Sequence, residues 1–346
     1  MWGRSTYNNG RTMKAFVLKH YGGPDGMGFA EMPRPQPGAG EVLVRVHSAG
    51  LNPVDFKIRQ GKLWPIYRPK LPVVMGNELA GTVVELGSGV RRFAIGERIF
   101  VRGHKAELGA FAEFALASEE LAAKVPSALD FDHAGGVPLA GLTALQTLRD
   151  ELHVKPGMRL LITGGTGGVG TFAIQLAKLM GAEVSVTCSE TGRALAESLG
   201  ADRVIDYKTE RLDDAVKAVD GALDLVGGAT LKECFRVVKP GGKIVSIAGT
   251  PEPNTARKDI APAFGLKALF WVASFRLRWL ARRRRVQYRY YFMHGSGSDL
   301  AELAALIEQE KLRVVVDRVF GFEKIAEAFA YLEQGHAKGK VVVRME

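Results

Sequence analysis

The fold is decided by residues 159–170, whose sequence is Arg-Leu-Leu-Ile-Thr-Gly-Gly-Thr-Gly-Gly-Val-Gly. The apolar start predicts a buried strand, and the apolar segment that continues through Met180 predicts a helix directly after the glycines. Glycines let the main chain approach a ligand closely, and a helix N-terminus favours the negative charge of a phosphate. In this strand–turn–helix context the glycines indicate a dinucleotide-binding loop rather than a merely tight turn.

Strands and helices alternate on the C-terminal side of this loop. Strands are expected at 183–187, 203–205, 222–226 and 243–247, and helices at 193–199 and 230–238. Such alternation predicts a parallel, doubly wound sheet.

The N-terminal part has a different pattern, in which short strands are divided by Gly and Pro. Strands are expected at 13–17, 42–46, 81–86 and 96–101. They predict a small, barrel-like β domain. With 346 residues, two domains are expected, in an α/β chain. Residues 1–12 precede the first strand, and we expect them to be a disordered leader.

The composition is that of an ordinary globular protein, with 47% hydrophobic and 24% charged residues. Two cysteines are too few for a disulfide scaffold or a Cys-rich zinc lobe. They favour a reducing setting, and we expect a cytoplasmic protein. The most apolar segment, 264–280, is interrupted by Lys267, Arg276 and Arg278, so it predicts no membrane span.

The end of the second strand after the loop bears on the choice of dinucleotide. NAD sites place an acid there to hold the ribose hydroxyls. Here Thr187 is followed by Cys188 and Ser189, although Glu190 is close. Arg193 lies one helical turn further on, and a guanidinium pairs well with a 2′-phosphate. NADPH is therefore favoured over NADH, with a solvated helix residue as the alternative for Arg193.

Further motifs follow one another in a fixed order between Met13 and the C-terminus. They are residues 49–57 (Ala-Gly-Leu-Asn-Pro-Val-Asp-Phe-Lys), 76–81 (Gly-Asn-Glu-Leu-Ala-Gly), 138–144, 199–202 with 205–207, and 335–340. Together with the glycine loop they resemble the quinone oxidoreductase (zeta-crystallin-like) branch of the medium-chain dehydrogenase/reductase superfamily, a group of alcohol dehydrogenase-like oxidoreductases. The resemblance implies a GroES-like catalytic domain at 13–137, a Rossmann domain at 138–310, and a tail, 311–346, that returns to the first domain. The active site would lie in the cleft between them.

The resemblance also implies which residues contact NADPH. They come from the glycine loop, the following strand ends and the tail, and they are Thr166, Gly168, Val169, Gly170, Ser189, Arg193, Tyr207, Val226, Ala248, Gly249, Lys338 and Gly339. A half-buried aromatic at a strand end is the alternative for Tyr207.

No metal site is expected. Zinc alcohol dehydrogenases bind the metal through Cys and His. The resemblance places Asn52, Asn77 and Leu139 at the positions of those ligands. An amide or a leucine is a poor zinc ligand, and Glu78 lacks metal partners, so we expect a zinc-independent enzyme.

The reactions implied by the resemblance are reductions of quinones or of α,β-unsaturated carbonyls (enones and enals). Such an enzyme mainly orients its reactants and donates hydrogen bonds to the growing oxyanion. Asn52 is the first candidate donor, although Asn52-Pro53 with Asp55 is equally typical of a helix start. Asp55, Lys57 and Thr143 are weaker catalytic candidates. The alternatives are an enoyl-thioester reductase, or an NADPH-binding structural or adaptor protein with little turnover.

Residues 264–291 are longer than the matching segment of the simplest quinone reductases. Apolar residues recur there at helical spacing, and several arginines fall on another face. We favour a helix that packs within the protein or at a dimer interface. The alternative is peripheral contact with an acidic membrane. No nucleic-acid-binding module is recognised, and the resemblance suggests a homodimer.

Overall fold

The computed structural model describes residues 7–64, 66–103, 109–260 and 264–345. The chain divides into two compact units. The first is Met1–Leu142 with Gly295–Glu346, and the second is Thr143–His294. This division differs from the expected limits at 138 and 310, because the segment after His294 already belongs to the first unit.

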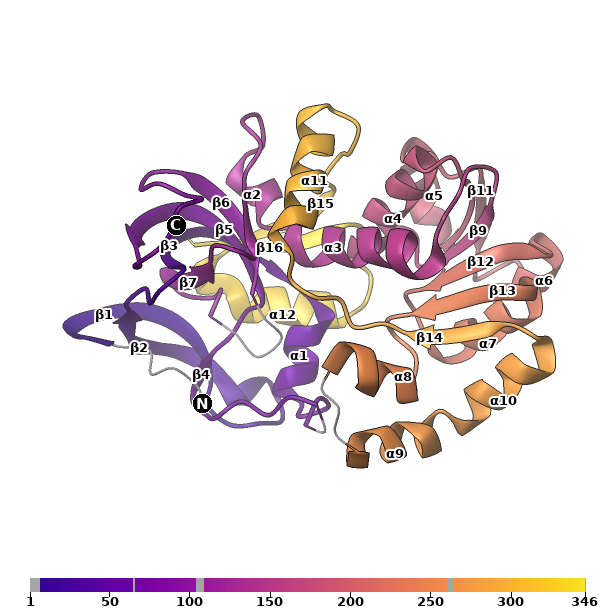
Figure 1. The fold of residues 1–346 in the computed structure, drawn as a ribbon, viewed down its shortest axis with the longest axis horizontal. Helices are drawn as coiled ribbons and strands as arrows, with labels where there is room; N and C mark the ends of the chain where they lie inside the picture. The colour runs from indigo at the N-terminus through magenta and orange to yellow at the C-terminus, as the bar shows by residue number, and fades with distance from the viewer. Residues whose placement is uncertain (1–6, 65, 104–108, 261–263, 346) are drawn as a thin grey trace. The chain divides into compact units, whose positions relative to one another are not determined.

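The second unit is built on a six-stranded parallel sheet (Figure 1). Its strands are β9 (Arg159–Thr163), β10 (Glu183–Cys188), β11 (Arg203–Asp206), β12 (Val219–Asp224), β13 (Val238–Ser246) and β14 (Gln287–Tyr290). Their spatial order is β11-β10-β9-β12-β13-β14, and every neighbouring pair is parallel. This order is that of a Rossmann sheet, so the predicted fold class is confirmed. The order reverses between β9 and β12, where such sheets bind their ligands.

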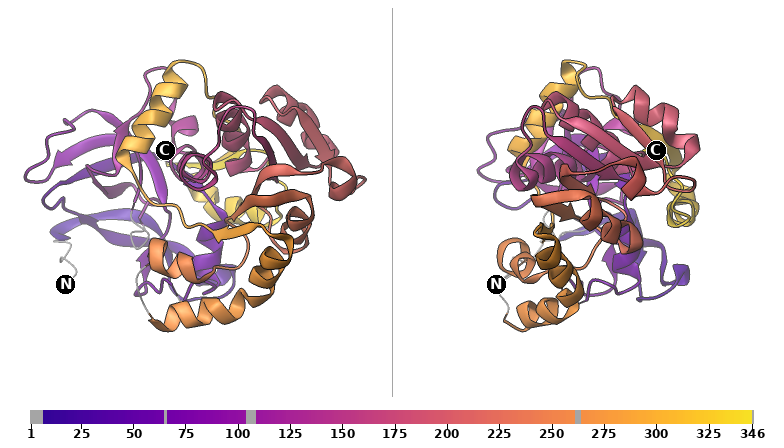
Figure 2. Two further views of the ribbon diagram at one scale, coloured as in Figure 1. Left: turned by 45° about the vertical axis from the view of Figure 1, so that its right-hand side comes forward. Right: turned by 90° about the vertical axis from the view of Figure 1, so that its right-hand side faces the viewer.

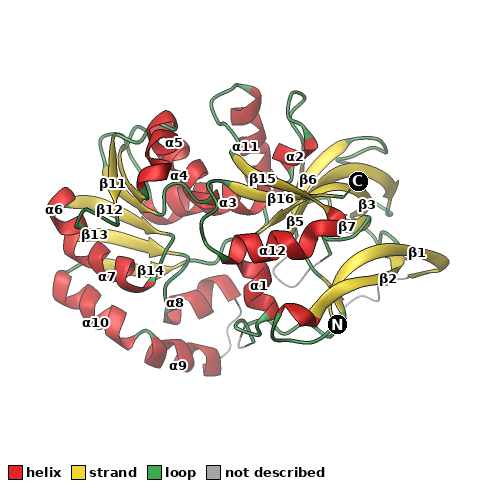
Figure 3. Ribbon diagram, turned by 180° about the vertical axis from the view of Figure 1, so that it is seen from behind, coloured by secondary structure: helices red, strands yellow, loops and turns green. Residues whose placement is uncertain are grey.

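Helices cover both faces of this sheet. They are η2 (Thr147–Leu152), α4 (Gly168–Leu179), η3 (Glu190–Gly192), α5 (Arg193–Ser198), α6 (Leu212–Ala215), α7 (Gly228–Val237), α8 (Pro253–Thr255), η4 (Ala256–Ile260), α9 (Phe264–Ala273) and α10 (Phe275–Arg284). Figure 3 shows α4 and α5 on one face, and α7 and α10 on the other. α7 buries Phe235 against Ile205, Ile244 and other apolar side chains of the sheet.

The first unit is made mainly of antiparallel strands. A three-stranded sheet contains β2 (Met27–Pro35), β1 (Tyr7–Leu18) and β4 (Val73–Val74). A seven-stranded sheet has the order β15 (Val316–Gly321), β16 (Lys340–Arg344), β3 (Glu41–Leu51), β5 (Glu78–Leu86), β6 (Arg98–Arg102) and β8 (Ala122–Lys124), with β7 (Phe114–Ser118) on β3. Among the described strands of this unit, β15 and β16 form the only parallel pair. This is the expected GroES-like β domain. β1 begins at Tyr7 rather than at Met13, so it includes part of the expected leader.

The C-terminal segment completes the first unit. The helices of the first unit are η1 (Pro24–Gly26), α1 (Pro53–Arg59), α2 (Phe131–Ala134), α11 (Gly297–Glu308), η5 (Phe322–Lys324) and α12 (Ile325–Glu333). Helix α3 (Pro138–Gln146) leads into the second unit. Phe329 of α12 packs on Phe16 and Phe111 in the core. β16 pairs antiparallel with β3, which joins the tail to the N-terminal strands. Among the described residues, no helix has the length and apolar character needed to cross a membrane.

Candidate functional site

The glycine loop is a tight turn fixed to the neighbouring strand. Gly164 has a φ of +67°, a conformation that side chains disfavour. Its N–H donates to Thr187 Oγ1 over 3.1 Å, and Gly165 N donates to Thr187 O over 2.9 Å. A Cβ at Gly170 would lie 2.4 Å from Gly164 O. Glycine at 164 and 170 therefore permits the tight turn, whose backbone is hydrogen-bonded to β10.

The loop opens α4 at the reversal of strand order. Gly167 is the N-cap of this helix. The first N–H groups of a helix have no acceptor within it. Gly167, Gly168 and Val169 are half-exposed, while the side chain of Thr166 is mostly buried. These donors and the helix dipole fit a diphosphate group.

Asp224, at the end of β12, joins the carboxyl ends of three strands. Its fully buried carboxylate accepts from Thr163 Oγ1 (3.1 Å), Ser246 Oγ (2.6 Å) and Gly227 N (2.9 Å). Sequence reasoning missed this residue, although a polar side chain ends each of β9, β12 and β13.

Three of the expected cofactor-binding residues, Val226, Ala248 and Gly249, donate backbone N–H groups to Asp224 or Ser246. Ser246 Oγ accepts from Ala248 N (3.2 Å) and Gly249 N (2.8 Å), which shapes the turn after β13. Val226, which follows β12, keeps 53% of its surface exposed. An exposed apolar side chain beside a polar turn suits one face of a nicotinamide ring.

Arg193 is held by two acidic side chains. Its Nε donates to Glu190 Oε2 over 2.9 Å, and its NH2 lies 3.7 Å from Glu210 Oε1. The hydrogen bond from Arg193 to Glu190 raises the pKa of the guanidinium further. A 2′-phosphate would have to compete with these two carboxylates.

The remaining cofactor candidates are divided between the two units. Tyr207 is 57% exposed, and Ser189 forms a hydrogen bond with Thr191. Lys338 and Gly339 belong to the first unit, whereas the other ten candidates lie in the second. Gly339 has a φ of +112°, and a Cβ there would meet Val315 O at 2.6 Å.

The first unit holds a buried cluster of charged and amide side chains. Lys340 Nζ, from β16, donates to Glu78 Oε1 over 2.8 Å and to Asn52 Oδ1 over 2.6 Å. Asn52 Nδ2 in turn donates to Glu78 Oε1 (2.6 Å) and to Gly50 O (3.2 Å). Glu78 Oε2 accepts from Leu139 N over 2.6 Å. Because both amide protons of Asn52 are engaged, it can donate to a substrate oxygen only by breaking one of these bonds.

A second part of the same cluster is centred on Asp55. Its carboxylate accepts from Asn52 N (2.8 Å), as expected at a helix start, and from Asn77 Nδ2 (2.6 Å). Burial raises the pKa of Asp55 to about 7, while those two hydrogen bonds lower it. Asp55 therefore titrates near neutral pH inside the first unit.

The donor set of this cluster does not fit zinc. Asn52 and Asn77 present amides, and Leu139 contributes only its backbone. The Lys340 ammonium already provides a cation beside Glu78. In the described part of the chain, no group of three or more His, Cys, Asp or Glu side chains is arranged for a metal.

The last two catalytic candidates differ in exposure. Lys57, on α1, is half-exposed, and burial lowers the pKa of its ammonium. Thr143, on α3, is buried, and its carbonyl accepts from Thr147 Oγ1 over 2.7 Å. Of the four catalytic candidates, Lys57 is therefore the one with a proton-donating group that solvent can reach.

Family models match both units. The alcohol dehydrogenase GroES-like domain matches residues 38–127, and a domain described as zinc-binding dehydrogenase matches residues 199–343. The second description names zinc, for which Asn52, Asn77 and Leu139 are poor ligands.

Proteins similar to this chain cover nearly all of it. The mitochondrial NAD(P)H oxidoreductase RTN4IP1 of Danio rerio is 35% identical, over 96% of this chain and 91% of that protein. A chloroplastic NADPH-dependent alkenal/one oxidoreductase of Arabidopsis thaliana is also 35% identical, over 96% of this chain and 80% of that protein. The solved quinone oxidoreductase of Coxiella burnetii is 30% identical and superposes with a TM-score of 0.84, over 97% of this chain and 100% of that one.

Proposed function

The chain belongs to the medium-chain dehydrogenase/reductase superfamily, in its quinone oxidoreductase branch, and we propose that this oxidoreductase uses NADPH to reduce quinones or α,β-unsaturated carbonyls. The observation that carries the proposal is the glycine loop, fixed to β10 and opening α4 where the strand order reverses. That geometry suits the diphosphate of a nicotinamide dinucleotide.

The choice of NADPH rests on Arg193. A guanidinium at this place can donate two hydrogen bonds to a 2′-phosphate. Glu190 favours NADH instead, because its carboxylate can accept hydrogen bonds from the ribose hydroxyls of that cofactor. The two side chains are bonded to each other in the structure, so they set the preference jointly.

The expected chemistry needs few protein groups. When bound, NADPH supplies the hydride. The loop and the N-terminus of α4 hold the diphosphate. Lys57 is our candidate for the proton donor, because its lowered pKa makes its ammonium a stronger acid. We assign Asn52 and Asp55 to shaping the site, and Thr143 to packing beside the nicotinamide. The names of the Arabidopsis and Coxiella relatives support enones and quinones as acceptors.

The cofactor assignment is tested by fluorescence titration with NADPH and NADH. Loss of a charge-assisted interaction costs about 1.5–3 kcal/mol, so Arg193→Ala should weaken NADPH binding by roughly 10- to 100-fold. The matched variant Glu190→Gln should tighten NADPH binding and weaken NADH binding. Equal affinity for both cofactors in the wild type, unaffected by Arg193→Ala, would exclude NADPH as the preferred reductant.

Turnover is tested with 9,10-phenanthrenequinone, a simple enone and an enoyl thioester. We expect NADPH oxidation with the first two, and a lower kcat in Lys57→Met. Tight NADPH binding without turnover of any acceptor would favour the structural or adaptor protein. Turnover confined to the thioester would favour the enoyl-thioester reductase.

Assembly and location complete the proposal. We propose a homodimer, as the resemblance to the quinone oxidoreductase branch suggests, and light scattering in solution tests it. We also propose a cytoplasmic location, supported by the two buried free cysteines and tested by fractionation of cells. No nucleic acid is proposed as a partner.

A further inference from the structure

The helices α9 and α10 carry an unusual concentration of exposed apolar side chains. Five of the eleven large apolar side chains that are exposed in the described residues lie within eleven positions of these helices. They are Leu269 (48% exposed), Trp271 (54%), Val272 (67%), Phe275 (57%) and Trp279 (52%). Figures 1 and 2 show the two helices, in orange, following one another along one side of the second unit. We call the exposed side of residues 264–285 the α9–α10 surface.

These apolar side chains are not needed to attach the helices. Phe270, Ser274 and Ala281 form a buried seam, at intervals of one or two helical turns, that faces the unit. Leu277 and Leu280 pack against the core beneath the sheet. These buried side chains provide the helix packing that we predicted for residues 264–291. The opposite side of each helix is exposed to solvent.

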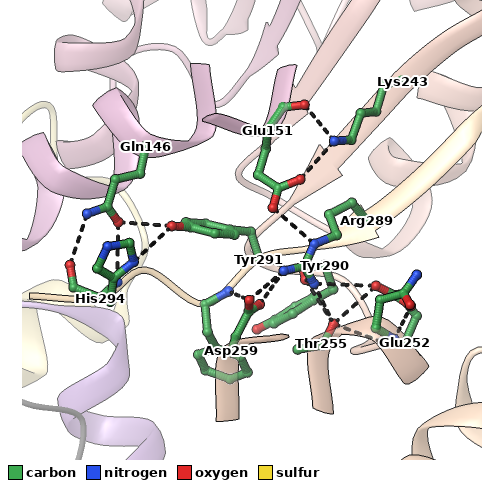
Figure 4. A network of polar contacts seen from close by, with 12 residues as sticks. Gln146, Glu151, Lys243, Glu252, Thr255, Asp259, Arg289, Tyr290, Tyr291 and His294 are labelled. Carbon is green, nitrogen blue, oxygen red and sulfur yellow. Dashed lines mark hydrogen bonds and ion pairs between the residues drawn. The ribbon is translucent and has the colours of Figure 1, made fainter. Parts of the chain in front are cut away.

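A buried polar network holds α8 and η4, which precede α9 in the sequence (Figure 4). Arg289, on β14, contacts both carboxylate oxygens of Asp259 at 2.5 and 2.6 Å. It also donates to Glu151 Oε1 over 3.2 Å, and its NH1 lies 3.4 Å from Glu252 Oε1. The network joins η4 and α8 to the sheet.

The α9–α10 surface is also strongly basic. Residues 264–285 contain one Lys and six Arg and no Asp or Glu. Arg276 and Arg282–Arg285 are exposed. Among the ion pairs formed within the described ranges, none involves these arginines. Arg278 lies over the ring of Trp271 and Arg283 over that of Trp279, at 4.9 and 5.4 Å from the ring centroids, so cations and apolar rings are intermixed.

We propose that the α9–α10 surface docks the protein on a bilayer that contains anionic lipid. Exposed Trp, Phe and Leu next to Arg are the side chains of helices that lie in a membrane interface. The headgroups would meet the arginines, and the acyl region would receive Val272, Phe275 and Trp279. This contact is independent of the proposed reductase activity.

Charge argues against the other occupants of this surface. A second copy packed symmetrically on the same surface would bring two sets of seven cations together. A polyanion such as RNA would neutralise the arginines but leave Leu269 and Val272 in water. An anionic bilayer satisfies both the cations and the aliphatic side chains.

The test is flotation of the full-length protein with two kinds of vesicle. One is pure phosphatidylcholine, and the other contains phosphatidylserine at roughly a third of the lipid. We expect binding to the second kind only, weakened by added salt because Coulomb attraction is screened. Binding should also shift tryptophan emission to the blue and make it quenchable by brominated lipid.

Two double variants separate the apolar from the ionic contribution. Val272→Ser/Trp279→Ser and Arg282→Glu/Arg283→Glu should each lower the bound fraction about tenfold, because both contributions are needed at an interface. The control variants Ile95→Ser and Lys311→Glu, at exposed positions of the first unit, should bind like the wild type. Unchanged melting temperature and cofactor binding show that each variant is folded.

Three results would overturn the proposal. The first is absence of flotation, or equal flotation with neutral and anionic vesicles. The second is tighter binding to an RNA homopolymer than to anionic vesicles. The third is a concentration-dependent dimer that Val272→Ser/Trp279→Ser abolishes, which would assign this surface to a second copy. Vesicle binding by a protein without reductase turnover would leave this inference intact while removing the proposed function.

Discussion

The pairing of Lys340 with Glu78 makes a strong prediction about stability. Both side chains are almost fully buried, and the ammonium lies 2.8 Å from the carboxylate. Lys340→Met keeps the apolar stem but removes the charge. Glu78 then retains only its bonds from Asn52 and Leu139 N. Removing one partner of a buried ion pair typically costs 3–5 kcal/mol, because the other charge stays uncompensated.

That cost translates into a large change in melting temperature. The first unit contains about 190 residues. For a unit of this size each kcal/mol shifts the melting temperature by roughly 2–4 °C, so Lys340→Met should lower it by roughly 6–20 °C. Differential scanning calorimetry of the full-length protein measures the shift. Lys311→Met, which removes an exposed lysine of the same unit, is the control and should change the melting temperature by less than about 2 °C.

The double variant Lys340→Met/Glu78→Gln distinguishes loss of charge from loss of packing. With both charges gone, the cluster is neutral apart from Asp55, and most of the lost stability should return. Two results would refute the reasoning. One is Lys340→Met melting with the wild type. The other is a double variant that is less stable than Lys340→Met, because the damage would then come from packing.

Three other predictions follow from the same structure. Because burial raises the pKa of Asp55 to about 7, its folded state binds a proton that the unfolded state releases near pH 4. The wild type should therefore lose stability between pH 4 and 7, by up to about 4 kcal/mol, and Asp55→Asn should lack this loss in denaturation curves compared across that range. Gly170→Ala should abolish NADPH binding in a titration, since its Cβ would meet loop oxygens, whereas Gly265→Ala, with open space around it, should bind normally. Arg289→Met removes the cation that pairs with Glu252 and Asp259 and leaves Glu151 paired with Lys243, so hydrogen exchange should become faster across 253–260 and 264–284 and stay unchanged in the first unit.

The second unit was largely predictable from its sequence because its signals are local. A buried strand, a glycine turn and a helix follow one another in residues 159–179, and each can be recognised from its own residues. The alternation of strands and helices then predicts a parallel sheet without any knowledge of distant contacts. What the local pattern missed is Asp224, whose role depends on hydroxyls from β9 and β13. Hydrogen bonds between strands far apart in sequence leave no periodic pattern.

The candidate catalytic residues were harder to interpret for the same reason. Asn52 was equally consistent with an oxyanion donor and with a helix start. The partner that engages its side chain, Lys340, lies 288 positions away. Only the antiparallel pairing of β16 with β3 brings the two together. Arg193 is similar, since its ion pair with Glu190 is local but its approach to Glu210 depends on the strand β11 between them.

Lys340 also explains how the first unit keeps a buried carboxylate without a metal. A Glu78 carboxylate enclosed by apolar strands needs a cation or several donors, because an isolated buried charge is costly. The chain supplies an ammonium from its last strand, an amide from Asn52 and a backbone N–H from Leu139. The Lys340 ammonium thus neutralises Glu78 as a bound cation would. Lys340 is the first residue of β16, the strand that pairs with β3. Strand β16 therefore both pairs with β3 and supplies the cation that neutralises Glu78, which is why substitution of Lys340 should destabilise the whole first unit.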